Sequence, residues 1–360
     1  MDFIDWRVAQ RVGELIAGTP PFGEVSASRV EPLARDFAAR VSAYSGLQTP
    51  TELPPLELVD RPAWIAANLR TMRPLLGRVS ERMPEDPSGL LAGPMRSASG
   101  LLMGAQVGAL TGMLSQRVLG QYDLALLDSA VPPRLLLLAP NLSQAARSLE
   151  LDRDQLVLWV TIHEITHAVQ FSGAPWLRDY LGGMITELID GMHVAVPSAE
   201  RGSWLPGLPD ASALRELVER ARRGELLRLT LGEERWRLVE RMQAVMSLIE
   251  GHAEHTMDVI GAELLPSLER LRAAMNQRRE NRGLPWRVVE RLLGLELKFR
   301  QYRIGRSFCD AVVADGGPSA LARAWRGPEA LPTQQELERP ALWLERMRAE
   351  TPALPAKSGA

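Results

Sequence analysis

Two histidines four residues apart, with a glutamate directly after the first, lie in the stretch VTIHEITHAVQF. On a helix that advances about 100° per residue, His163 and His167 project from one side and Glu164 lies on their flank. Neutral imidazoles on a rigid element are suited to zinc, and a neighbouring carboxylate can accept a proton from water. The stretch therefore predicts a zinc site with its own general base, although solvent-facing residues of an ordinary helix can show the same pattern.

A third ligand would decide between these interpretations, and the stretch SLIEGHAEHTMD offers candidates. Glu250, Glu254 and Asp258 recur every four residues and share one helix face. His252 and His255 point away from it. The rest of this helix is apolar, and burying a row of carboxylates costs free energy unless they are paired or bind a cation. We expect one carboxylate of this face to complete a His₂Glu site for a single zinc ion.

The two stretches resemble the zincin superfamily of metallopeptidases, in the branch where a glutamate on a second helix is the third ligand. More closely, the chain resembles a bacterial family of zincin-like hydrolases of unknown substrate, which has been associated with biosynthesis of a deazaflavin cofactor. The other segments that carry this resemblance are DWRVAQRVGELIAG, GAQVGALTGMLSQRVLGQYDLALL, RLLLLAPNL and QYRIGRSFCDAVVADGG. It spans nearly the whole chain and implies a zincin-like α+β fold with metallopeptidase activity.

The resemblance also implies a role for each residue of the motif. His163 and His167 match the two zinc ligands, and Glu164 matches the general base that activates water. Glu250 matches the ligand glutamate. We therefore expect a zinc-dependent hydrolase that cleaves peptide bonds, and the alternative is a non-catalytic zinc-binding scaffold that uses the same site for structure.

Two assignments stay open. Glu254 matches the position that orients a ligand histidine, but in an alternative register Glu254 is the ligand and Asp258 orients. No motif marks a residue that would stabilise an oxyanion. His255 is a candidate, as are His193 and Tyr180, and a structural role is the simpler interpretation of each.

The elements that must position these residues are mainly helical. The helix with the two histidines is predicted to begin after Asp152, with Gln155 completing a capping box, and to end at Gly173. Leu135–Leu138, bracketed by prolines, predicts a buried or cleft-edge strand with which an extended substrate could pair. Asn141 is expected to cap the short helix that follows. The expected fold is α+β and zincin-like, with an active-site helix and a short edge-strand region.

Three regions are expected along the chain. Residues 1–130 form a helical N-terminal region packed on the catalytic part, and residues 131–345 form the zincin-like metal-binding region. Residues 346–360 form a flexible tail. The loop 197–212, rich in proline and glycine, is expected to cover the cleft.

An uncharged segment between Arg96 and Arg117 has glycines at every fourth position. In a bilayer this pattern would favour close helix dimers, but serine, threonine and glutamine dilute its apolar character. We predict a buried helix whose glycines admit a neighbouring backbone. The glycines are Gly100, Gly104, Gly108 and Gly112.

Composition narrows the class of protein. Hydrophobic residues at 46% and charged residues at 24% are typical of a soluble globular chain. A net charge of −2 gives no reason to expect nucleic acid or an anionic membrane as a partner. A lone cysteine, Cys309, excludes an intramolecular disulfide. The predicted partner is a peptide or protein substrate, and the predicted location is the cytoplasm.

Overall fold

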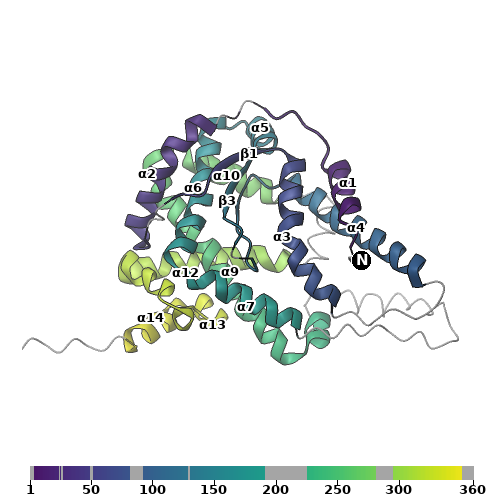
Figure 1. Ribbon diagram of the computed structural model, residues 1–360. Coiled ribbons are helices and arrows are strands. Elements are labelled where there is room, and N and C mark those ends of the chain that lie inside the picture. Colours follow the sequence, from purple (N-terminus) through teal and green to yellow (C-terminus); the bar gives the residue numbers. More distant parts are fainter. Residues whose placement is uncertain are drawn as a thin grey trace, which may run out of the picture.

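Helices cover both faces of a small sheet in the computed structural model (Figure 1). The structure describes residues 4–23, 25, 27–48, 52–81, 92–128, 130–190, 225–280 and 295–350. The loop 197–212 and His193 lie outside these residues. The strands are β1 (Leu56–Val59), β2 (Gly120–Asp123) and β3 (Arg134–Leu138). This mainly helical α+β architecture confirms the expected fold class.

The helices of the N-terminal half are α1 (Trp6–Ala17), α2 (Ala27–Ser45), α3 (Arg61–Glu81), α4 (Ala92–Ser115), α5 (Ala139–Ser148), α6 (Arg153–Gly173) and α7 (Trp176–Asp190). The C-terminal half contains α9 (Glu225–Leu264), α10 (Leu268–Glu280), α12 (Leu295–Leu321), α13 (Gln334–Glu338) and α14 (Pro340–Ala349), with 3₁₀ turns at Ala322–Trp325 and Pro328–Ala330. Within α9 and α12, Gly232 and Gly317 have φ of 77° and 71° and interrupt the helix. Helix α14 includes residues 346–349 of the expected tail.

The sheet has the order β1–β3–β2, with β1 parallel and β2 antiparallel to β3. Leu135 lies opposite both Leu56 and Tyr122. Because β3 has a neighbour on each side, the prediction that an extended substrate pairs with Leu135–Leu138 is wrong. The strand is buried as expected, but the edge position next to α6 belongs to β2. Strands from both sides of residue 130 therefore share one sheet.

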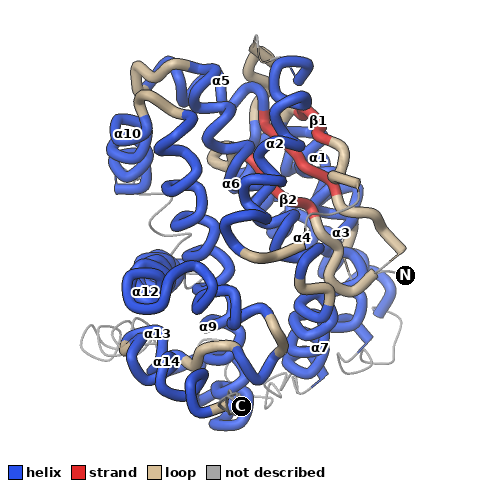
Figure 2. Tube along the Cα trace, turned by 90° about the vertical axis from the view of Figure 1, so that its left-hand side faces the viewer, coloured by secondary structure: helices blue, strands red, loops and turns tan. Residues whose placement is uncertain are grey.

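Alternate leucines of β3 enter two separate hydrophobic cores. Leu135 and Leu137 belong to a large core formed with α2, α5, α6 and the C-terminal helices. Leu136 and Leu138 belong to a smaller core with α1 and α3. None of the four is more than 1% exposed. Side chains of a strand point alternately to its two faces, so burial of all four requires helices on both sides, as Figure 2 shows.

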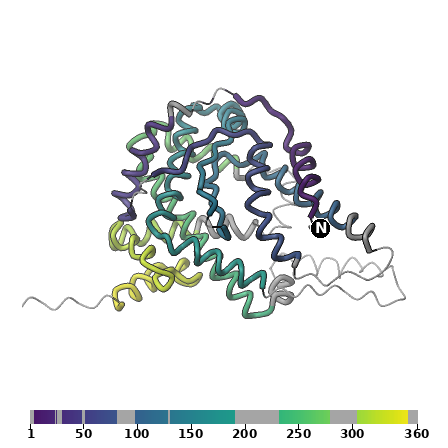
Figure 3. Tube along the Cα trace, in the orientation of Figure 1, coloured from purple at the N-terminus to yellow at the C-terminus, as the bar shows by residue number. Residues whose placement is uncertain are grey.

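The glycine-rich helix α4 lies along α1, and both are seen side by side in Figures 1 and 3. An added Cβ at Gly104, Gly108 or Gly112 would lie within 2.5 Å of a backbone oxygen of the α1 segment. The glycines therefore let two helix backbones approach closely, as predicted. The helix is not buried all round, however, because Leu101 and Leu102 are exposed. Among the described residues, no helix has the length and apolarity needed to cross a membrane.

Helix α5 begins earlier than predicted. It starts at Ala139, so Asn141 lies inside it rather than at its cap. The Asn141 amide instead donates to the carbonyls of Ser115 and Val118, at 2.7 and 2.6 Å, and accepts from Arg61 at 2.8 Å. Asn141 thus holds the end of α4 and the segment that leads into β2.

Helix α6 begins as predicted. The Asp152 side chain accepts from the backbone amide of Gln155 at 2.8 Å, and the helix ends at Gly173. The Gln155 side chain does not complete a capping box in the described contacts. It bonds Ser267 at the turn before α10. Asp152 therefore fixes the start of α6, and Gln155 connects this end of the helix to the turn before α10.

We expect Gly108→Ala to lower the free energy of unfolding. Its Cβ would lie 2.3 Å from the Ala9 carbonyl oxygen, so α1 and α4 must separate, at a cost of about 1–3 kcal/mol. Gly183→Ala in α7 is the matched control, because the added Cβ meets nothing within 4 Å. Alanine at this helical position should raise the free energy of unfolding by about 0.5–1 kcal/mol. Urea denaturation of the two variants checks this. Equal stability of the two would contradict the close packing of α1 on α4.

Candidate metal centre

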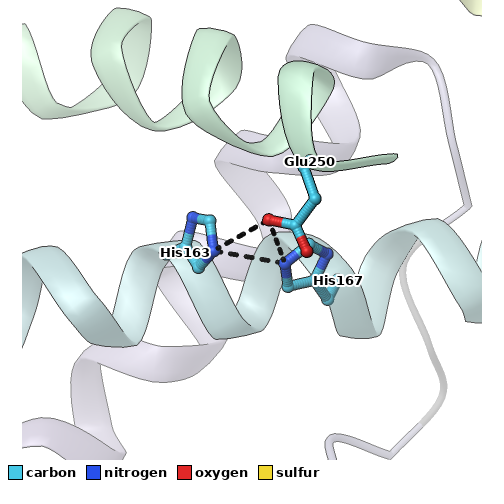
Figure 4. Close-up of side chains that lie close together, drawn as sticks. All are labelled: His163, His167 and Glu250. Carbon is cyan, nitrogen blue, oxygen red and sulfur yellow. Dashed lines mark hydrogen bonds and ion pairs between the residues drawn. The ribbon is translucent and has the colours of Figure 1, made fainter. Parts of the chain in front are cut away.

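Three side chains from two helices converge at the predicted site (Figure 4). His163 and His167 project from α6, and Glu250 projects toward them from α9. The two imidazole Nε2 atoms lie 3.2 Å apart. The Glu250 Oε2 atom lies 3.8 Å from Nε2 of His163 and 3.9 Å from Nε2 of His167. The structure thus brings together the two histidines and the first of the two candidate glutamates.

The donor set and its spacing fit zinc. Zinc bonds to imidazole nitrogen and carboxylate oxygen are about 2.0–2.2 Å long, so neighbouring ligand atoms of a tetrahedral site lie about 3.3–3.6 Å apart. The separations of 3.2 to 3.9 Å bracket this range. The Glu250 side chain is 24% exposed, so it has room for the small rotation that would bring it closer. Among the described residues, these three are the group able to hold a metal ion.

Gln170 fixes the orientation of His167. The Gln170 amide nitrogen donates to the Ile249 carbonyl at 2.9 Å. A carbonyl can only accept, so the amide oxygen must be the atom that faces His167 Nδ1 at 2.9 Å. That nitrogen therefore carries the proton, and Nε2 keeps its lone pair for a metal. Because Ile249 precedes Glu250, the same amide also ties the two ligand helices together.

His252 completes this hydrogen-bond set. Its Nδ1 lies 2.8 Å from the amide nitrogen of Gln170, which has a second proton to donate. The ring is 1% exposed and packs edge-on against Trp325, with centroids 5.0 Å apart. Burial lowers the pKa of His252 to about 3. The neutral ring accepts from Gln170, so His252 supports the ligands from outside the cluster, in agreement with its predicted position away from the carboxylate face.

Glu164 lies against strand β2. Its Oε2 accepts from the Tyr122 backbone amide at 2.7 Å. An added Cβ at Gly120 would lie 2.9 Å from the Glu164 carboxylate, so glycine makes room for this side chain. Burial raises the pKa of Glu164 to about 7, while His167 and the Tyr122 amide act in the opposite direction. A carboxylate with a pKa near neutrality is suited to both accept and release a proton.

The other two carboxylates of the α9 face lie outside the ligand cluster. Glu254 is buried one turn further along α9. Asp258 is buried next to Arg272, to which it is hydrogen-bonded, and Arg306, at 2.5 Å. The acidic face is thus divided between a metal-facing end and an end neutralised by arginines. The geometry favours Glu250 over Glu254 as the third ligand.

The structure places His255 in a different network. Its Nε2 lies 2.6 Å from the Tyr44 hydroxyl, and its Nδ1 lies 2.6 Å from the Asp310 carboxylate. Both ring nitrogens are therefore engaged, which favours a structural role over stabilisation of an oxyanion. Tyr180 packs against Trp176 in α7.

The chain matches a protein-family model over residues 4–344, and that model describes zincin-like metallopeptidases. The chain belongs to this zincin-like family. A solved structure from Chloroflexus aurantiacus, described as a candidate hydrolase with a novel fold, superposes with a TM-score of 0.68 at 31% identity. The match covers 97% of this chain and 100% of that one. A comparison with proteins of curated function found no match.

Membership of the zincin-like family agrees with the metal-ligand geometry of the described residues. The family implies zinc, and the cluster supplies the nitrogen and oxygen donors that zinc prefers. Sequence patterns did not reveal the roles of Gln170, Tyr122 and Gly120. Only Gln170 had a signal, because it shares the helix face of His163 and His167.

Glu250→Gln should weaken zinc binding much more than Glu254→Gln. The Glu250 carboxylate lies beside both imidazoles, so its loss removes a charged ligand, with an expected loss of more than about 100-fold in affinity. Competition with a chromophoric chelator measures both variants. If Glu254→Gln were the weaker binder, the alternative register, with Glu254 as ligand and Asp258 orienting it, would be correct.

Gln170→Leu should lower zinc affinity by about 10- to 100-fold, the range typical of residues that orient a metal ligand. The variant keeps the side-chain volume but leaves His167 Nδ1 and the Ile249 carbonyl without this partner. Thr161→Val serves as a control on the same helix, because Thr161 bonds only its own helix backbone in the described contacts. The same chelator competition applies. Unchanged affinity in Gln170→Leu would show that the amide does not orient the ligand.

Proposed function

We propose that this zincin-like protein is a zinc-dependent hydrolase that cleaves peptide bonds. One observation carries the proposal: a buried carboxylate, Glu164, lies directly beside a cluster of two imidazoles and one carboxylate. Zinc bound there would supply a Lewis acid that polarises a carbonyl and makes water more acidic. The family and the hydrolase description of the Chloroflexus protein support the reaction class.

Glu164 would act as the general base. The Tyr122 backbone amide donates a hydrogen bond to one Glu164 oxygen at 2.7 Å, and this bond fixes the Glu164 carboxylate against β2. Its proximity to His167 on the next helical turn keeps it at the side of the ligand cluster. Burial raises the pKa of Glu164 to about 7, so the group can take a proton from water and return it to the leaving amine near neutral pH.

The composition of the cluster supports catalysis over a structural metal site. Structural zinc sites are closed by four protein ligands, whereas catalytic sites keep a position for water or substrate. The described residues offer three ligands. A non-catalytic scaffold would need a fourth protein ligand close to this group.

Strand β2 is the element along which an extended peptide would lie in this proposal. It is an edge strand of the sheet, and it contacts Glu164 through Tyr122 and Gly120. The Tyr122 ring also stacks on Phe171 of α6, with centroids 5.8 Å apart, which holds strand and helix together. A link to deazaflavin biosynthesis, a cytoplasmic location and the absence of a nucleic-acid partner stay predictions.

Glu164→Gln tests the mechanism. The amide keeps the size of the side chain but is not a base, so hydrolysis should fall by about 10²–10⁴-fold. Zinc affinity should stay close to that of the unaltered protein, because Glu164 is not one of the three ligands. Mass spectrometry of a peptide mixture measures cleavage, and metal analysis measures zinc.

His163→Ala is the comparison, since it should bind zinc much more weakly and lose hydrolysis. Full peptide cleavage by the zinc-loaded Glu164→Gln protein would contradict the assignment of Glu164 as general base. Absence of cleavage in the zinc-loaded unaltered protein would favour the scaffold alternative.

A further inference from the structure

Two hollows beside the metal centre share part of their lining. A cleft of about 200 Å³ is lined by His163 and Glu164. A larger cavity of about 940 Å³ lies between the start of α5 and the end of α10. Arg117 and Arg278 line both hollows. These two arginines therefore border both the cleft beside the metal centre and the larger cavity.

The larger cavity is strongly positive. Its described lining contains arginines but no aspartate or glutamate, and its other polar groups are amides and hydroxyls. In the cleft, Glu164 is the one carboxylate among the described lining residues. The four arginines of the cavity are Arg61, Arg117, Arg147 and Arg278. Such a hollow attracts an anionic group and repels a cationic one.

Arg61 has a structural role that accounts for its position. Its guanidinium donates to the Asn141 side chain at 2.8 Å, to the Ala17 carbonyl at 2.6 Å and to the Gln144 side chain at 3.0 Å. These neutral acceptors anchor α1 and α3 to α5. Arg117 and Arg278 are the arginines that line the cleft together with His163 and Glu164.

The backbone that carries Arg117 is held in place. Asn141 binds the carbonyls of Ser115 and Val118 on either side of it. Arg278 donates to the carbonyl of Arg117 itself at 2.9 Å. The two arginines, from the segment before β2 and from α10, are thereby kept next to each other at the rim of the cleft.

The charges of the two guanidinium groups act on each other. Burial and, to a smaller extent, the charge of Arg117 lower the pKa of Arg278 to about 10. No carboxylate among the described residues forms an ion pair with Arg278. A planar guanidinium binds a carboxylate through two parallel hydrogen bonds, so a ligand with this group would offset the repulsion.

We propose that Arg117 and Arg278 bind a carboxylate of the substrate, which makes carboxylate-bearing peptides the substrate class of this site. The inference rests on the proposed hydrolase function. The carboxylate can come from a peptide C-terminus or from an aspartate or glutamate side chain. In either case the arginines would hold it in the cleft that His163 and Glu164 also line, and the scissile bond would lie between them and Glu164.

Paired peptide pools test the proposal. Three pools of N-acetylated hexapeptides are compared: neutral sequences with a free C-terminus, the same sequences with a C-terminal amide, and amidated sequences that contain one aspartate in place of asparagine. Mass spectrometry measures cleavage by the zinc-loaded protein. Retention of the uncleaved pools on zinc-loaded Glu164→Gln protein measures binding without turnover.

We expect at least one carboxylate-bearing pool to be preferred over the neutral amidated pool by about tenfold or more, in both readouts. A preference for the free C-terminus identifies a terminal carboxylate, and a preference for the aspartate pool identifies an acidic side chain. The preference should fall to within about twofold in Arg278→Ala and in Arg117→Ala. Arg278→Lys should keep part of it, because the charge remains but the bidentate geometry is lost.

Arg147→Ala is the matched control. Arg147 is an exposed arginine of the same cavity but does not line the cleft, so the preference should persist. Equal use of neutral and carboxylate-bearing pools, or an unchanged preference in both Arg278→Ala and Arg117→Ala, would overturn the proposal. Thermal unfolding confirms that each variant is folded. Cleavage without preference overturns this inference alone, whereas a binding preference without cleavage overturns the hydrolase function alone.

Discussion

The side-chain amide of Gln170 joins the two helices on which the metal centre depends. It donates to the Ile249 carbonyl of α9 and to His252, and it accepts from His167 of α6. Every hydrogen-bonding atom of this fully buried amide is used, so its orientation is fixed. Because one ligand histidine and the residue before Glu250 share this partner, the distance between the ligand helices and the tautomer of His167 are set together.

Close contacts of glycines with neighbouring backbone or side chains position α9, α12 and β2 around the metal centre. Gly251, directly after Glu250, faces Gly305 of α12, and an added Cβ at Gly251 would lie 2.2 Å from the backbone of Gly305. At the other side of the site, Gly120 lets β2 approach Glu164. Close contacts of this kind leave little freedom to shift α9 or β2. The Glu164 and Glu250 carboxylates are therefore each held next to a close backbone contact.

The sequence predicted the candidate metal ligands more fully than the strands and helices that position them. The spacing of His163, Glu164 and His167 determines their common face on any helix, and the four-residue repeat limited the third ligand to a few carboxylates. The choice of Glu250 over Glu254 depends on how α9 crosses α6, which local spacing does not determine. The strand order of the sheet could not be predicted from the sequence either, because a run of leucines indicates burial but not whether a strand is central or at an edge. Asn141 was misassigned because its partners are far away in the chain.

Zinc K-edge X-ray absorption of the full-length protein loaded with one equivalent of zinc tests the central claim most directly. The account predicts two imidazole ligands and a shell of oxygen ligands, all at about 2.0–2.2 Å, with no sulfur. It also predicts that the imidazole signal falls to one in His163→Ala. A third imidazole, or a signal unchanged by that substitution, would show that zinc does not bind between α6 and α9 in the way that the structure indicates.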